Sequence, residues 1–211
     1  MAARHSYLEH DGPIAFAHRG GTSVAPENSL RAFQDAIDLG FQYIETDVHA
    51  TSDGVLVAFH DDDLLRTCGV AGKISELDYS EVRNARVNGT EPIPLLQDIF
   101  DAWPQARINI DCKSDAALQP LIASLRSPHV LDKVCVGSFS DKRLSVLRET
   151  FGPSLCSSLG PKQVALLRVR SWIGVVKPFD GALAAQIPLK QGPITLTDQR
   201  LVDDAHSAGL Q

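Results

Sequence analysis

The stretch QYIETDVHA at residues 42–50 decides the fold, because acidic and apolar side chains alternate along it. Successive side chains of a β-strand point to opposite faces, so Glu45, Asp47 and His49 share one face and leave the other apolar. The stretch RINIDCK at residues 107–113 repeats the pattern, with a polar face made of Asn109, Asp111 and Lys113. Both stretches are predicted strands with one charged side and one apolar side.

Strands and helices alternate along the rest of the chain. Further apolar or alternating runs predict strands at IAFAHRG (14–20), VLVAFHD (55–61), KVCVGSF (133–139), SLCSSLG (154–160) and PITLTD (193–198). Helical spacing predicts helices from an N-cap at Asn28 to Gly40, from Pro94 to residue 103, over 140–151, from Pro161 onwards, and over 197–208. This alternation favours parallel βαβ units in an α/β fold, either closed as a barrel or open as a doubly wound sheet.

Composition limits the class of protein. With 211 residues, 44% of them apolar, the chain can bury one sizeable core, and we expect a single domain over residues 1–211, with the glycine-containing segment 62–92 as a small insertion after the third strand. The formal charge of −6 includes no lysine- or arginine-rich run, so nucleic acid is not an expected partner. The chain shows neither a secretory signal nor a run of ~20 apolar residues, so we expect a cytoplasmic protein without a transmembrane segment.

The charged strand faces predict a shared site. Parallel strands in α/β proteins are covered on both sides, so the polar faces must turn into a barrel or cleft, where carboxylates need a cation or hydrogen-bond donors. His18 and His60 end two more predicted strands, and active sites of barrels gather at the C-terminal ends of their strands. The sequence therefore predicts an active site at this rim.

The residue types at the rim favour phosphodiester cleavage. An all-oxygen ligand set suits a hard divalent cation such as Mg²⁺ or Ca²⁺ and is offered by Glu45, Asp47 and Asp111. Donors for an anionic group that also touches the cation come from Arg19 and Lys113. A proton can be taken from a nucleophile and given to a leaving alkoxide by the pair His18 and His60.

Four motifs resemble the glycerophosphodiester phosphodiesterase family: AHRGGTSVAPENSLRAF (17–33), YIETDVHATSDGVLVAFHD (43–61), IPLLQDIF (93–100) and INIDCKSD (108–115). The resemblance runs from about Ile14 to the C-terminus. It implies a TIM (β/α)8-type barrel of the phospholipase C-like phosphodiesterase kind that hydrolyses glycerophosphocholine or glycerophosphoethanolamine to sn-glycerol 3-phosphate and an alcohol. In the family mechanism, the neighbouring glycerol hydroxyl attacks phosphorus to give a cyclic phosphate, which water then opens.

The same resemblance implies a role for each residue of the rim. The acid and base pair is matched by His18 and His60, the metal ligands by Glu45, Asp47 and Asp111, and the phosphate-binding cations by Arg19 and Lys113. The third carboxylate is more usually glutamate in the family, so Asp111 is one methylene shorter than the common ligand.

The second departure concerns the end of the chain. After AHSAGLQ (205–211) the family continues into a strand with V-x-x-W-T-x-N and a last helix, so we expect a barrel with seven of its eight strands, whose open sheet edges favour self-association. Two alternatives stay open: a truncated metal- or phosphate-binding remnant with weak or no activity, and a phospholipase D-like relative that cleaves lysophospholipids.

Overall fold

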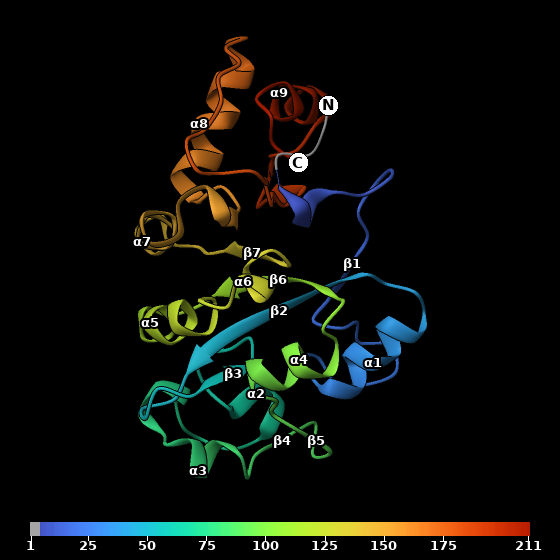
Figure 1. Cartoon of the computed structure of the whole chain (residues 1–211), viewed down its shortest axis with the longest axis vertical. Coiled ribbons are helices and arrows are strands. Elements are labelled where there is room, and N and C mark those ends of the chain that lie inside the picture. The colour runs from blue at the N-terminus through green and yellow to red at the C-terminus, as the bar shows by residue number, and fades with distance from the viewer. Residues whose placement is uncertain (1–4) are drawn as a thin grey trace. The chain divides into compact units, whose positions relative to one another are not determined.

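The computed structural model describes residues 5–211, which form two compact units (Figure 1). The first unit is His10–Val134, and the second is Cys135–Gln211 together with the described residues 5–9. Each unit is described by itself. All of the predicted site residues lie in the first unit.

Three parallel strands form the centre of the first unit: β1 (Phe16–His18), β2 (Tyr43–Ala50) and β6 (Arg107–Cys112), with β2 in the middle. Both faces of β2 are buried along its whole length, as predicted for a parallel strand in an α/β fold. Helix α5 (Asp115–Ser124) packs against β2 and β6, so the apolar face of the sheet is covered by a helix.

The predicted third parallel strand is wrong. β3 (Leu56–Ala58) pairs antiparallel with the end of β2, with Val48 opposite Ala58. A parallel crossover needs about a dozen residues, whereas residues 51–55 make a tight turn in which the Thr51 amide bonds to the Val55 carbonyl oxygen. The chain therefore reaches His60 through a hairpin rather than through a βαβ unit.

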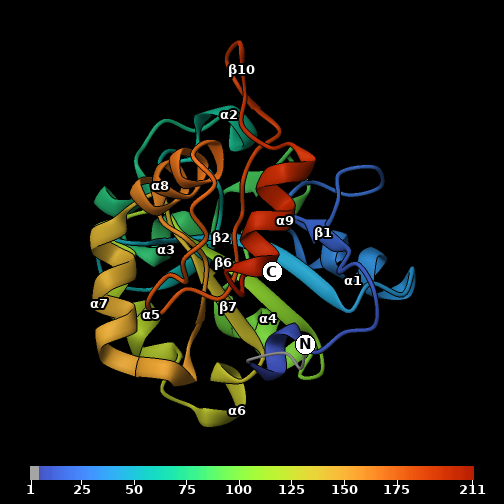
Figure 2. The ribbon, with the colours of Figure 1, turned by 90° about the horizontal axis from the view of Figure 1, so that it is seen from above.

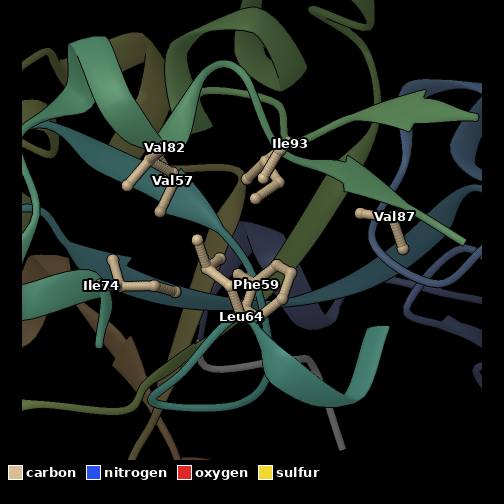
Figure 3. Close-up of a cluster of buried hydrophobic side chains, with 8 residues drawn as sticks. Val57, Phe59, Leu64, Ile74, Val82, Val87 and Ile93 are labelled. Carbon is tan, nitrogen blue, oxygen red and sulfur yellow. The ribbon is translucent and has the colours of Figure 1, made fainter. Parts of the chain in front are cut away.

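Segment 62–92 contains more structure than its sequence predicts. It holds α2 (Leu65–Cys68), a 3-10 turn at Ile74–Glu76, α3 (Tyr79–Val82) and a short hairpin of β4 (Arg86–Val87) and β5 (Glu91–Pro92). Its apolar side chains pack onto β3 in one cluster (Figure 3), made of Val57, Phe59, Leu64, Ile74, Val82, Ala85, Val87 and Ile93. We call this set the hairpin cluster.

The helix limits of the first unit differ slightly from the prediction. Helix α1 (Leu30–Asp38) is capped by Ser29, whose side chain accepts from the Ala32 amide, and not by Asn28. Gly40 follows its C-cap with φ +93°, as predicted for a C′ glycine. Helix α4 (Leu96–Ala102) begins after Pro94 rather than at it. The remaining helix of this unit is the short α6 (Pro128–Leu131).

In the second unit, β7 (Val134–Gly137), whose first residue belongs to the first unit, pairs in parallel with β8 (Cys156–Ser157). The predicted helices are confirmed as α7 (Asp141–Phe151), α8 (Pro161–Trp172) and α9 (Gln199–Ser207), and α8 packs against α9 (Figures 1 and 2). Two 3-10 turns, at Ser6–Leu8 and Gly152–Ser154, complete its helical structure.

The last predicted strand is confirmed only over two residues, and its pairing is antiparallel. In PITLTD only Ile194–Thr195 forms a strand, β10, which pairs antiparallel with β9 (Lys190–Gln191) as a small hairpin. Closure of a seven-stranded barrel, self-association and the single-domain boundary stay predictions. Among residues 5–211, no helix combines the length and apolar character needed to cross a bilayer.

Candidate active site

The sheet register brings the three predicted carboxylates together. In the pairing of β2 with β6, Asp47 lies opposite Asp111, and Glu45 lies opposite Asn109. All four side chains belong to buried residues. The Lys113 ammonium follows on the same face, and its Nζ lies 2.8 Å from Asp47 Oδ1 and 2.8 Å from Asp111 Oδ2. Three carboxylates and one lysine thus share a buried polar face.

The pKa values of Glu45 and Lys113 are both raised, from different causes. Burial, and next the neighbouring Asp47, raise the pKa of Glu45 to about 8. Asp111 Oδ1 is buried without a hydrogen-bond partner in the described part of the chain. Burial lowers the pKa of Lys113, but its ion pairs with Asp111 and Asp47 outweigh that effect and leave the pKa raised.

The carboxylate oxygens of Glu45, Asp47 and Asp111 are suitable ligands for a divalent cation, although they are not already arranged around a common metal position. An all-oxygen set with an unpartnered buried oxygen is the environment that Mg²⁺ or Ca²⁺ accepts. Within residues 5–211, however, no three His, Cys, Asp or Glu side chains are arranged to hold a metal ion. The Lys113 ammonium instead neutralises part of the charge between Asp47 and Asp111.

A strained turn after β1 holds Arg19 at the carboxylates. Arg19 has φ +53°, its amide donates to Glu45 Oε2 at 3.0 Å, and its Nε lies 3.2 Å from Asp47 Oδ2. Gly20 follows with φ +78°, and a Cβ there would lie 2.8 Å from the Phe33 amide nitrogen. Only glycine fits so close to helix α1, which explains the H-R-G sequence in physical terms.

Sequence reasoning missed the roles of Asn28 and Glu27. The Asn28 side chain is buried, donates to Asp47 Oδ2 at 3.1 Å and accepts from Thr46 Oγ1 at 2.8 Å. The carboxylate of Glu27 lies 3.3 Å from Arg19 Nη1. Asn and Ser are both good N-caps, so the pair 28–29 allowed either residue to be the cap. The quoted P-E-N-S motif was the available signal that these residues do more than cap a helix.

The two predicted catalytic histidines lie on different segments. His18 is the most open residue of the set, with its side chain 70% exposed and Nε2 3.8 Å from Glu45 Oε2. Its pKa is lowered, first by partial burial and then by the Arg19 charge, and the His60 charge acts in the same direction.

His60 lines a cavity of about 560 Å³ with Lys113 and His49. Its Nδ1 lies 2.6 Å from Asp61 Oδ1, and its carbonyl oxygen accepts from His49 Nε2 at 3.1 Å. His18 instead lines a second, mostly apolar cavity of about 400 Å³, together with residues of β1, of the loop 20–25 and of α1. The site thus has a polar pocket on the His60 side and an apolar one on the His18 side.

A family model and a bacterial relative match the chain along most of its length, and a mammalian relative matches about half of it. The model of the "Glycerophosphoryl diester phosphodiesterase family" matches residues 18–211. The "Probable glycerophosphodiester phosphodiesterase 2" of Mycobacterium tuberculosis is 37% identical over 216 residues, which cover 97% of this chain and 80% of that protein. The rat "Lysophospholipase D GDPD1" is 38% identical over 110 residues, which are 46% of this chain and 35% of that protein.

Solved structures show the same fold. The glycerophosphoryl diester phosphodiesterase domain of an uncharacterised M. tuberculosis protein superposes with a TM-score of 0.79 at 18% identity, covering 95% of this chain and 87% of that one. A phosphodiesterase from Oleispira antarctica, solved with the product sn-glycerol-3-phosphate, gives a TM-score of 0.61 at 22% identity, covering 94% and 90%. The predicted α/β, TIM-barrel class is confirmed by these likenesses. The chain belongs to the glycerophosphoryl diester phosphodiesterase family and is an enzyme of that class.

Proposed function

We propose that the chain hydrolyses glycerophosphodiesters, such as glycerophosphocholine or glycerophosphoethanolamine, to sn-glycerol 3-phosphate and an alcohol in the presence of a divalent cation. The observation that carries the proposal is the register of β2 and β6, which sets Asp47 beside Asp111 with Lys113 bound to both. The product complex of the Oleispira relative supports the choice of substrate.

The residues that hold the phosphate come from three strands or their ends. Glu45, Asp47 and Asp111 would hold Mg²⁺ or Ca²⁺, and the bound cation would neutralise charge on the phosphate. The side chains of Arg19 and Lys113 bind the non-bridging phosphate oxygens. Both lie against Asp47, one of the proposed metal ligands, so a phosphate bound to the metal would be within their reach. Arginine adds a planar pair of donors that orients the phosphate.

The two histidines move the protons. One imidazole takes the proton of the neighbouring glycerol hydroxyl as its oxygen attacks phosphorus, and the other gives a proton to the leaving alcohol. The product of this step is a cyclic phosphate. In the second step the roles reverse: water attacks phosphorus, the ring P–O bond breaks, and sn-glycerol 3-phosphate is released.

The test is product formation from glycerophosphocholine. We expect sn-glycerol 3-phosphate with Mg²⁺ or Ca²⁺, none after addition of a chelator, and losses of at least about 100-fold in His18→Ala and His60→Ala. His206→Ala, an exposed histidine on α9, is the matched control and should leave the rate unchanged.

Two outcomes would favour the alternatives. A folded, metal-loaded protein that forms no product would support the non-catalytic reading. Faster turnover of lysophosphatidylcholine than of glycerophosphocholine would support a lysophospholipid-cleaving enzyme, with the apolar pocket beside His18 as the place for an acyl chain.

A further inference from the structure

A chain of ion pairs joins His60 to Arg19 through Arg66. The Arg66 guanidinium contacts Asp61 through both Nε and Nη2, with Nη2 3.1 Å from Asp61 Oδ1. The same Nη2 lies 2.5 Å from Glu27 Oε1. Asp61 contacts His60, and Glu27 contacts Arg19, so one arginine lies between two residues of the proposed machinery.

We propose that Arg66 is a positioning residue that holds Asp61 against the His60 imidazole and Glu27 against the Arg19 guanidinium. Arg66 itself is half exposed and belongs to α2, in the segment after the hairpin. The catalytic consequence rests on the proposed function, whereas the positioning of His60 can be tested without turnover.

The first arm of this arrangement sets the orientation of His60. The Asp61 carboxylate bonds to Arg66 and is held ionised, because that hydrogen bond is the largest cause of its pKa falling to about 2. An ionised carboxylate only accepts hydrogen bonds, so His60 Nδ1 carries the proton of the 2.6 Å contact. Nε2 is then the nitrogen that remains to exchange protons with a substrate.

The second arm sets the place of Arg19. Glu27 is mostly buried, with its side chain 17% exposed, and takes Arg19 Nη1 at 3.3 Å on each of its two oxygens. Arg66 Nη2 donates to Oε1 of the same carboxylate. Without Arg66, Arg19 is the remaining one of these two arginine partners of Glu27. The Arg19 guanidinium can then move toward Glu27 and away from Asp47.

Only arginine suits this position. Its planar fork reaches two carboxylates at once, whereas a lysine ammonium is a single point charge. The neighbours Leu64 and Thr67 are buried, and Leu64 belongs to the hairpin cluster, so the fold of segment 62–92 fixes where the fork lies. Segment 62–92 thereby contributes to the site through Arg66, although it supplies none of the three proposed metal ligands.

Separate effects on kcat and KM distinguish the contact of Asp61 with His60 from the contact of Glu27 with Arg19. Asp61→Asn is expected to lower kcat about 10- to 100-fold, because the His60 imidazole loses the carboxylate that orients it. Glu27→Gln is expected mainly to raise KM, through Arg19. Arg66→Gln should show both effects, and Arg66→Lys should restore neither fully.

Arg83→Gln is the matched control, because Arg83 is an exposed arginine of the same segment and belongs to none of these ion pairs. It should leave kcat and KM unchanged. If Arg66→Gln does not fold, the same measurements are made on Arg66→Lys.

A second measurement does not need turnover. Imidazole ¹H–¹⁵N correlation spectra of the whole protein, with His60 assigned from His60→Gln, should show the Nδ1-protonated form and lose it in Arg66→Gln and Asp61→Asn. If the wild type forms no product but its spectra change in this way in the two variants, the positioning role is supported and the proposed function is refuted. An active wild type whose Arg66 variants keep the imidazole spectrum and KM would overturn the positioning role, even if kcat falls.

Discussion

Asp47 and Asp111 lie opposite each other on the neighbouring parallel strands β2 and β6. In a parallel pair, opposite residues project from the same face, so two carboxylates meet in a buried place. Lys113 lies two residues beyond Asp111 and therefore shares that face, with its Nζ 2.8 Å from each carboxylate. This relationship makes the charge of the Asp111 side chain the first property to test.

Asp111→Asn is expected to weaken binding of Mg²⁺ or Ca²⁺ about 10- to 100-fold and to lower kcat similarly, because an amide is a neutral and weaker ligand. Asp111→Glu, which installs the family's usual residue, should keep both within about threefold. Calorimetric titration of the metal measures the affinity. Equal affinity of the Asn variant and the wild type would remove Asp111 from the ligand set.

The metal-free protein should lose stability as the pH rises from about 4.5 to 8. The Glu45 pKa is raised to about 8 in the folded chain, so the unfolded chain releases this proton first and is favoured as the pH increases. The stabilising contribution of the bound proton is complete below about pH 4.5 and is gone above about pH 8. Urea unfolding midpoints measured in the presence of a chelator should fall as the pH rises over this range, and they should fall less steeply in Glu45→Gln than in the wild type. Parallel plots of midpoint against pH for the wild type and Glu45→Gln would contradict the raised pKa of Glu45.

Gly20→Ala is expected to destabilise the fold by about 2–4 kcal/mol. The added Cβ would clash with the backbone of α1, and alanine would also be strained at the positive φ of this position. Gly54→Ala is the control, with φ +83° but nothing within 4 Å of the new Cβ. It should cost about 1 kcal/mol. Chemical unfolding of both variants measures the difference, and equal losses would argue against close packing at Gly20.

Leu64→Ala should cost about 2–5 kcal/mol, because Leu64 is fully buried in the hairpin cluster and its loss leaves a cavity. Leu65→Ala, at an exposed neighbour, should change stability by no more than about 0.5 kcal/mol. Thermal and urea unfolding give both values. If the two variants were equally stable, the cluster would not hold the segment.

Much of the site could be predicted from the sequence. Alternation along residues 42–50 and 107–113 determines which side chains share a face, and the parallel register of β2 and β6 then makes those faces meet. The end of a helix at a residue such as Gly40 also follows from local rules, because the left-handed backbone conformation that ends a helix favours glycine. The strand faces and the helix ends depend on neighbours in the chain.

The tertiary structure alone decided the direction of β3, the partner of Asn28 and the bridge from Arg66 to Glu27. An apolar run predicts a strand but not its orientation, and a polar residue before a helix can cap it or turn into the site. Glu27 and Arg66 lie 39 positions apart, so no local pattern relates them. By itself the sequence determined the faces and periods of the elements and the family. Which distant charges meet depends on packing, because ion pairs form only after the hairpin and its apolar cluster have placed their backbones.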